Sequence, residues 1–394
     1  MTRVTIYADD LTGALDTAVK FTGGARRARV TWAPRSLDCD VLALDMETRD
    51  AKPRVAARLA AAWIGLARGL TFKKMDSTLR GPFAVQALAL AKALRLRGPL
   101  FAPALPDSGR AVVGGRLLLY GEPLEKTAYA DDPRCPPASG DLVALVGAAS
   151  GKAPALLGLE VVRRGAAAVR SVLAAAQGAI VADAESEADL RVLAEALLVE
   201  REWLPVGSAG LAQALAAALG WEAASCQRHR ELPELVVCGS GNPVSQAQAR
   251  HLAEATGLPL LCPTSGGPES LISLVVRCHA RRGLAILAMP EEHLGWHESR
   301  MVLAALATCT ATALRTLGVR CFSVTGGETL RLIADQLGLL SLEPLCELAP
   351  GVVLSQAQAP ELGELRIISK AGGFGGQEIL SLLCSPGPAA LQEK

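Results

Sequence analysis

The sequence predicts an α/β protein of two domains, each a mostly parallel sheet flanked by helices. The chain has 394 residues, which is more than one hydrophobic core usually accommodates. Short apolar runs of strand type, such as residues 3–8 and 41–45, alternate with stretches that have helical spacing of apolar residues. Several of these runs end in polar or glycine-rich loops, as strands of an open α/β sheet do at their carboxyl ends.

The composition argues against several classes of function. Forty Lys and Arg face 39 Asp and Glu, so the net charge is only +1, and we expect no nucleic-acid partner. No uninterrupted apolar stretch of about 18 residues occurs. We therefore expect no membrane span, no signal peptide and a cytoplasmic location. The ten cysteines contain no C-x-x-C pair, so neither a zinc ribbon nor a redox pair is expected.

A polar run near residue 228 is the predicted domain boundary. Residues 1–228 form the first predicted domain and residues 229–394 the second. Residues 131–155 are rich in Pro, Gly, Ser and Asp and are predicted to form a loop of the first domain.

An acidic turn follows the first predicted strand. The run Asp9-Asp10-Leu11-Thr12-Gly13 leads into a stretch of helical spacing. One Asp is enough to cap a helix, so two adjacent acids favour a ligand-binding role for Asp9 and Asp10. Since neighbouring residues of an extended segment face opposite sides, we expect these two side chains to diverge.

Arg49 follows the second predicted strand, in the position of a clamp for a carboxylate or phosphate. A surface arginine paired with Glu47 or Asp50 is an equally good interpretation of this segment alone. Both interpretations are retained.

Residues 73–81 are the stretch around which the chain is organised. An apolar lead-in ends in nine residues that carry two Lys, one Asp, two hydroxyls and one Arg. Fixed donors beside a carboxylate suit a polyhydroxylated anion. The alternative is a solvated loop in which Ser77 or Thr78 caps the following helix. The candidate ligand-binding residues here are Lys74, Asp76, Ser77, Thr78 and Arg80.

Three further predicted strands, all in the second half, end in glycine-rich turns. Such turns let backbone N–H groups and a helix N-terminus face a phosphate. A flexible hinge is the alternative for each turn, but three turns at strand ends favour phosphate binding. The runs are Gly239-Ser240-Gly241, Gly326-Gly327-Glu328-Thr329 and Lys370-Ala371-Gly372-Gly373-Phe374-Gly375.

In their order and spacing, the acidic turn, residues 74–81 and the glycine turns at 326–329 and 370–375 resemble the four-carbon acid sugar kinase family. The resemblance covers almost the full length. It implies ATP-dependent phosphorylation of the terminal 4-hydroxyl of threonate, erythronate or an oxo-tetronate. It also implies an N-terminal acid-sugar domain and a C-terminal nucleotide domain.

The resemblance, together with the turns described above, assigns two sets of residues. Asn242 and Gly373 depart from the family, which usually has a small hydroxyl residue and Asn there; this leaves the strength of ATP binding open. The predicted sugar-acid residues are Asp9, Asp10, Arg49, Lys74, Asp76, Ser77, Thr78 and Arg80. The predicted ATP residues are Ser240, Gly326, Gly327, Glu328, Thr329, Lys370, Gly372 and Gly375.

Phosphoryl transfer needs alignment, charge neutralisation and a proton acceptor. We expect Asp76, and after it Asp10, to accept the proton, and Lys74 to neutralise developing charge. Mg²⁺ bridging the ATP phosphates is expected, although the sequence displays no dedicated metal site. The expected partners are the sugar acid and ATP, and a homodimer remains open.

Three other functions compete with this interpretation. A haloacid-dehalogenase-like phosphatase uses an Asp-x-Asp-x-Thr turn, whereas Asp9 and Asp10 are adjacent. A nicotinamide dehydrogenase would require Gly-x-Gly-x-x-Gly after the first strand, which is absent. A non-catalytic sensor of a sugar acid would bind the acid without consuming ATP.

Overall fold

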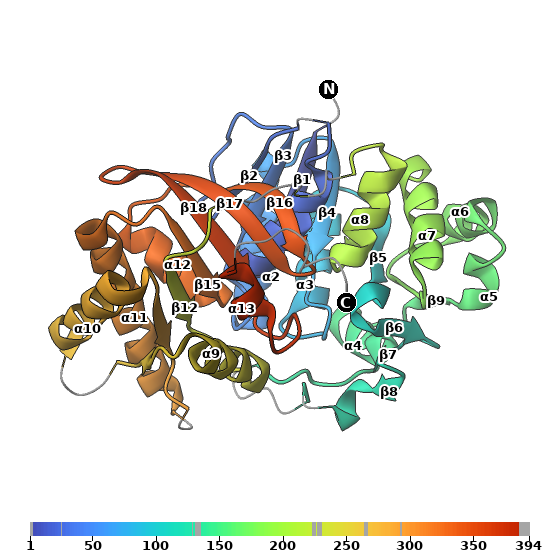
Figure 1. Ribbon diagram of the computed structural model, residues 1–394. Coiled ribbons are helices and arrows are strands. Elements are labelled where there is room, and N and C mark those ends of the chain that lie inside the picture. The colour runs from blue at the N-terminus through green and yellow to red at the C-terminus, as the bar shows by residue number, and fades with distance from the viewer. Residues whose placement is uncertain are drawn as a thin grey trace. The chain divides into compact units, whose positions relative to one another are not determined.

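The computed structural model describes residues 3–24, 26–127, 129–130, 135–222, 226, 231–263, 267–291 and 294–385. The chain forms two compact units, Met1–Ala224 and Ser225–Lys394, and most of the polar run at the predicted boundary lies outside the described residues. Each unit is built on its own mostly parallel sheet with helices (Figure 1), which confirms the predicted fold class.

The sheet of the first unit has eight strands in the order β2-β3-β1-β4-β11-β5-β10-β9, and every neighbouring pair is parallel. Its central strands are buried along their whole length, which is why they appear in the sequence as continuous apolar runs. The strands are β1 (Val4–Ala8), β2 (Ala28–Thr31), β3 (Val41–Asp45), β4 (Leu70–Lys74), β5 (Gly98–Ala102), β9 (Ala155–Leu157), β10 (Ile180–Ala182) and β11 (Trp203–Gly207).

Large apolar side chains on these strands form the core of the first unit. Phe72 and Phe101 are fully buried, and each contributes about 1.5–3 kcal/mol relative to an exposed position. The ring of Phe83, the first residue of α3 (Phe83–Ala93), meets that of Phe101 edge-on, with 6.1 Å between the ring centres. The hydroxyl of buried Tyr7 donates to the carbonyl oxygen of Trp63 at 3.0 Å, so its polar atom is satisfied inside the core.

The helices of the first unit include one that the sequence did not predict. The predicted loop at 131–155 was wrong over α4, where Asp141 caps the N-terminus and Gly151 (φ 71°) ends the helix. These two caps stabilise an apolar segment whose flanks resemble a loop. The helices are α1 (Leu11–Ala18), α2 (Pro53–Ala62), α3 (Phe83–Ala93), α4 (Leu142–Ser150), α5 (Leu159–Val162), α6 (Ala166–Ala175), α7 (Glu187–Val199) and α8 (Ala209–Ala218).

A small antiparallel sheet was also not foreseen. It consists of β6 (Arg110–Val113), β7 (Arg116–Leu119) and β8 (Glu122–Pro123). Gly114 and Gly115 form the turn between β6 and β7. Their backbone amides donate hydrogen bonds of 2.8 Å to the carboxylate of Asp183, which lies just after β10. This contact ties the small sheet to the carboxyl end of the main one.

The second unit has a seven-stranded sheet in the order β13-β14-β12-β15-β18-β17-β16. The first five strands are parallel, whereas β17 pairs antiparallel with both β18 and β16 and extends one edge (Figure 1). The strands are β12 (Leu235–Cys238), β13 (Leu260–Leu261), β14 (Ala285–Ala288), β15 (Cys321–Thr325), β16 (Glu343–Ala349), β17 (Val352–Ala359) and β18 (Gly363–Lys370). The helices are α9 (Pro243–Thr256), α10 (Gly267–Arg282), α11 (Trp296–Leu317), α12 (Gly327–Gln336) and α13 (Ile379–Leu383).

A disulfide joins Cys226 to Cys346 on β16 within the second unit. The two cysteines are 120 positions apart in sequence, so their spacing gave no sign of the pairing. Of the helices among the described residues, none combines the length and the apolar character needed to cross a lipid bilayer.

Candidate active site

Three loops of the first unit meet at the carboxyl edge of its sheet. Strand β1 lies between β3 and β4, with Ala8 opposite Asp45 and Tyr7 opposite Lys73. The parallel register therefore brings the acidic turn, the loop of Arg49 and residues 74–80 to one place.

Arg49 is the centre of this cluster. Its Nε donates to Asp9 Oδ2 at 2.8 Å, and its Nη2 donates to Asp10 Oδ1 at 2.7 Å and lies 3.6 Å from Asp76 Oδ1. These three carboxylates outweigh the effect of burial and hold the pKa of Arg49 well above its usual value. Of the two interpretations of Arg49, the structure supports a position inside the cluster.

The expectation that Asp9 and Asp10 diverge was wrong, because both carboxylates reach Arg49. Strand β1 ends at Ala8, and the chain bends before Asp10 caps helix α1. Asp10 Oδ1 accepts from the amide of Gly13 at 3.1 Å and Oδ2 accepts from Thr12 Oγ1 at 2.6 Å. The alternation of a strand therefore no longer applies at this position.

Asp76 is the most strongly bonded acid of the cluster. Arg80 donates to both of its oxygens, and the amide and hydroxyl of Thr78 donate to Oδ2. Burial alone would raise the pKa of Asp76, but Arg80 and Arg49 hold it well below the usual range. Asp76 is therefore held as an anion.

Two lysines complete the charge of the cluster. Lys74 Nζ donates to the carbonyl oxygen of Met75 at 2.8 Å, close to Gly13 at the start of α1. Lys73 is fully buried, and burial lowers its pKa to about 8. In the described part of the chain, neither ammonium group has a carboxylate partner within 4.0 Å, which leaves an excess of positive charge that suits an anionic ligand.

Sequence reasoning missed Arg110 of β6 in this cluster. Its guanidinium donates to Ser77 Oγ and lies over the ring of Tyr129 at 5.6 Å. Arg110 is 5% exposed and is the first residue of β6, outside the motifs to which the sequence assigned a role. The only sequence signal is that Arg110 ends the polar run Pro106-Asp107-Ser108-Gly109-Arg110, which follows the apolar run of β5.

The glycine turns of the second unit also meet at one sheet edge. Strand β15 lies between β12 and β18 in parallel register. The amide of Gly239 donates to Thr325 O at 3.1 Å, and the amide of Gly326 donates to Lys370 O at 3.0 Å. The three turns are thus joined by backbone hydrogen bonds.

Close backbone approaches explain two of these glycines. A methyl group on Gly372 would lie 2.8 Å from Ser240 Oγ, and one on Gly239 would collide with Thr329 Oγ1. Gly326 has φ 105°, which favours glycine, and its neighbours Gly327 and Glu328 begin α12. Ser240, the 326–329 turn and Gly372 therefore lie side by side, as their predicted common role requires.

Lys370 does not point toward solvent as a direct phosphate ligand would. It is fully buried, and its Nζ donates to the carbonyl oxygens of Ala371, Gly372 and Phe374 at 3.0–3.1 Å. An ammonium group has three protons, so these acceptors use all of them. Burial lowers the pKa of Lys370 to about 8.

Asn242, where the resemblance predicts a small hydroxyl residue, lies just before α9. The side-chain Oδ1 of Asn242 accepts from the backbone amide of Val244 at 2.9 Å and caps α9. The backbone amide of Asn242 donates to Ser240 Oγ at 3.3 Å. Asn242 therefore caps α9 as a Ser or Thr could, and its backbone contact with Ser240 does not depend on its side chain.

The described residues contain no group of three His, Cys, Asp or Glu side chains that could hold a metal ion. Mg²⁺ in proteins usually keeps several waters and is held through one or two carboxylates and substrate phosphates.

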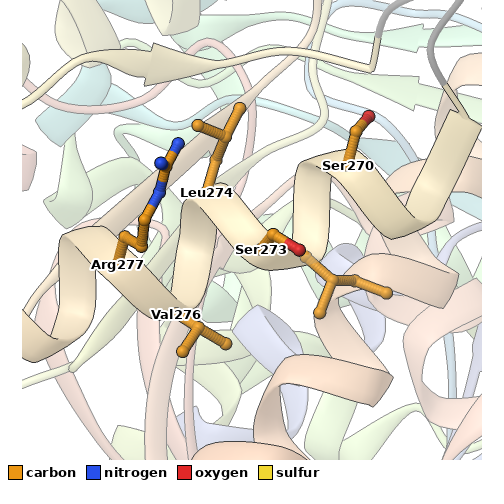
Figure 2. Close-up of a pocket in the computed structure, with 6 residues that line it drawn as sticks. Ser270, Ser273, Leu274, Val276 and Arg277 are labelled. Atoms are coloured by element: carbon orange, nitrogen blue, oxygen red, sulfur yellow. The ribbon is translucent and has the colours of Figure 1, made fainter.

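A surface depression of about 590 Å³ lies elsewhere on the second unit, along α10 (Figure 2). Its lining residues all come from that helix, and none belongs to a glycine turn: they are Ser270, Ile272, Ser273, Leu274, Val276 and Arg277. A wall made by one helix does not provide converging polar groups, so we do not assign a ligand to it.

Fold and site together define a two-unit α/β protein with a cluster of charged side chains at the sheet edge of one unit and three joined glycine turns at the sheet edge of the other. Residues 4–215 match a family described as a sugar-binding N-terminal domain, and residues 235–380 match a nucleotide-binding C-terminal domain. The chain belongs to the four-carbon acid sugar kinase family.

Named relatives support this assignment, and solved structures share the fold. A D-threonate kinase of Cupriavidus necator is 36% identical over 95% of both chains, and a 3-oxo-tetronate kinase of Methylobacterium radiotolerans is 31% identical over 94% of this chain and 96% of its own. A crystal structure from Salmonella typhimurium LT2 shares the fold, with a TM-score of 0.79, 22% identity and coverage of 97% and 98%. A citrate-bound, domain-swapped dimer from Bordetella bronchiseptica gives a TM-score of 0.50 at 27% identity, with coverage of 97% and 98%.

Proposed function

We propose that this protein transfers the γ-phosphate of ATP to the terminal 4-hydroxyl of a four-carbon sugar acid. The observation that carries the proposal is the meeting of the three predicted sugar-acid segments at one sheet edge around Arg49. The names of the relatives support threonate or 3-oxo-tetronate as the acid, and D-threonate is the first compound to test.

In the first unit, we propose that Lys74 and Arg49 attract the carboxylate of the acid, while Ser77 and Thr78 contribute hydroxyl groups. Asp76 and Arg80 keep this loop in shape, because their bidentate ion pair is almost buried. Asp9 is 3% exposed at its side chain and acts as the anchor of Arg49.

We assign proton acceptance to Asp10 in preference to Asp76. A carboxylate whose pKa is held far down is a weak base, and this applies to Asp76. The side chain of Asp10 is 17% exposed, compared with 9% for Asp76, so a substrate hydroxyl can reach it more easily.

In the second unit, we propose that the backbone of Gly326, Gly327, Gly372 and Gly375 and the hydroxyl group of Ser240 surround the phosphates of ATP. Thr329 is 1% exposed and would support the turn from within. Glu328 lies in the first turn of α12 and completes this set. Mg²⁺ would neutralise the phosphate charge and would be held by phosphate oxygens and water.

The test is a coupled assay of ADP release with Mg²⁺ and a panel of tetronates and oxo-tetronates. We expect ADP formation that depends on one of these acids, and a product phosphorylated at its terminal carbon by NMR. Release of phosphate from a phosphorylated tetronate without ATP would favour the phosphatase instead. Tight binding of the acid without ADP formation would favour the sensor.

We also propose that the protein forms a homodimer. The support is the domain-swapped dimer of the related Bordetella bronchiseptica protein. Light scattering coupled to gel filtration should give twice the monomer mass of 40.9 kDa, and a monomer mass at assay concentration would contradict this.

A further inference from the structure

The glycine loop, residues 371–376, is held from beneath by three side chains. Lys370 Nζ donates to the carbonyl oxygens of Ala371, Gly372 and Phe374. Ser245 Oγ, on α9, donates to Gly372 O at 2.6 Å. Gln248 Nε2, three residues further along the same face of α9, lies 2.9–3.0 Å from the carbonyl oxygens of Phe374, Gly375 and Gly376.

This pattern fixes the direction of the amide groups of the loop. The described part of the chain has no cis peptide bond, and in a trans peptide the N–H points opposite to the C=O of the same unit. Because the carbonyls of the loop point inward to Lys370, Ser245 and Gln248, the amides that follow them point outward. Among the described residues, no acceptor is found for the amides of Gly372, Gly375, Gly376 and Gln377.

Outward amides without acceptors among the described residues, in a loop rich in glycine, form an array of donors suited to phosphate oxygens. We propose that Gln248, Ser245 and Lys370 are positioning residues for nucleotide binding: they turn the carbonyls of the glycine loop inward and thereby aim its amides at the phosphates. This inference rests on the proposed function and extends it to residues that do not touch the nucleotide.

The burial of the three side chains supports a purpose beyond packing. Ser245, Gln248 and Lys370 are all 0% exposed, and burial of polar groups is unfavourable unless their hydrogen bonds are satisfied. Gln248 Oε1 has no partner among the described residues, so only the donor end of this side chain is used. An apolar residue would fill the same space at lower cost if packing were its only role.

The test compares Gln248→Met, which keeps the volume but removes both donors, with Gln246→Met on the same helix. Within the described residues, the side chain of Gln246 has one hydrogen-bond partner, Pro290 O at 3.5 Å, and has no hydrogen bond to the glycine loop. Binding of Mg-ATP is measured by calorimetry without sugar acid, together with kcat, both KM values and the thermal unfolding temperature. We expect Gln248→Met to weaken ATP binding about tenfold. Carbonyl groups that lose this donor can turn away from the interior, and ATP binding must then restore the outward direction of the amides at a cost of about 1.4 kcal/mol, which corresponds to tenfold.

The KM for the sugar acid should stay within about twofold in Gln248→Met, and Gln246→Met should behave as wild type. A purely structural role would lower the unfolding temperature without a selective change in ATP binding, and that result would overturn the proposal. If Gln248→Met does not fold, Ser245→Ala removes one donor and should weaken ATP binding to a smaller degree; unchanged binding there overturns it too. A wild-type protein that binds no ATP would instead refute the proposed function.

Discussion

Arg80 donates one hydrogen bond to each carboxylate oxygen of Asp76, from Nε to Oδ2 and from Nη2 to Oδ1, both at 2.9 Å. Arg49 approaches the same Oδ1 at 3.6 Å. Asp76 therefore links the loop of residues 74–80 to the arginine that holds the acidic turn. This position explains why the residue first expected to accept a proton is better suited to hold the cluster together.

Asp76→Asn should lower kcat/KM for the sugar acid at least about 100-fold, which corresponds to about 2.7 kcal/mol of transition-state stabilisation. The side-chain amide of Asn carries no negative charge. Two guanidinium groups, those of Arg80 and Arg49, therefore lose an anionic partner at a site that is largely shielded from solvent. Steady-state kinetics and calorimetry with ATP are the measurements. ATP affinity should be unchanged, because the glycine turns lie in the other unit.

Asp38→Asn is the matched control, since Asp38 is an exposed acid of the same unit. Its kinetics should equal those of the wild type. Wild-type turnover in Asp76→Asn would remove Asp76 from the mechanism altogether.

The stability of the first unit should fall in acid because of the same carboxylates. The pKa values of Asp76 and Asp9 are lowered in the folded protein, whereas an unfolded Asp titrates near 3.9. Their stabilising contribution is therefore complete above about pH 4 and is lost as the pH falls through the folded pKa values. Four of the five tryptophans, at positions 32, 63, 203 and 221, lie in the first unit, so urea unfolding followed by fluorescence reports mainly on it.

In this experiment Asp76→Asn should be less stable than wild type at pH 7, and the difference should shrink as the pH falls below about 4. A difference that stays constant from pH 7 to pH 3 would show that Asp76 is not held as an anion in the folded state.

Much of the first site could be predicted because a parallel sheet collects the carboxyl ends of its strands. Asp9, Asp10, Arg49 and residues 74–80 each follow an apolar run directly, and the register of β1 with β3 and β4 brings them together. The glycine turns follow β12, β15 and β18 in the same way. Such sites can be found from local patterns alone.

The residues that were missed depend on contacts that no local pattern reveals. Ser245 and Gln248 are polar residues inside a helix, where the usual expectation is a solvent-facing position, and their partners lie about 127 positions away. Arg110 enters the first cluster through an unforeseen antiparallel sheet. The direction of Lys370 was also unpredictable, since a lysine before glycines suggests a phosphate ligand and its burial comes only from the tertiary structure.

Gly372→Ala should raise the Kd for Mg-ATP about tenfold, because overpacking a close contact typically costs 1–3 kcal/mol. The new methyl group would lie 2.8 Å from Ser240 Oγ, and Gly65→Ala is a suitable control because nothing lies within 4 Å of its added Cβ. Calorimetry measures the affinity. Wild-type affinity in the single variant would mean that ATP does not depend on this contact.

Gly13→Ala should produce the complementary change and raise the KM for the sugar acid about tenfold, for the same overpacking reason. The added methyl group would lie 2.5 Å from Asp10 Oδ1 and 3.1 Å from Lys74 Nζ, so it would displace the acid that caps α1 and crowd the lysine beside it. Steady-state kinetics at saturating ATP measure the change, and calorimetry should find wild-type affinity for Mg-ATP. Gly65→Ala again serves as the control in the same unit. If Gly13→Ala weakened ATP binding and left the KM of the acid unchanged, the assignment of the sugar acid to the first unit would have to be abandoned.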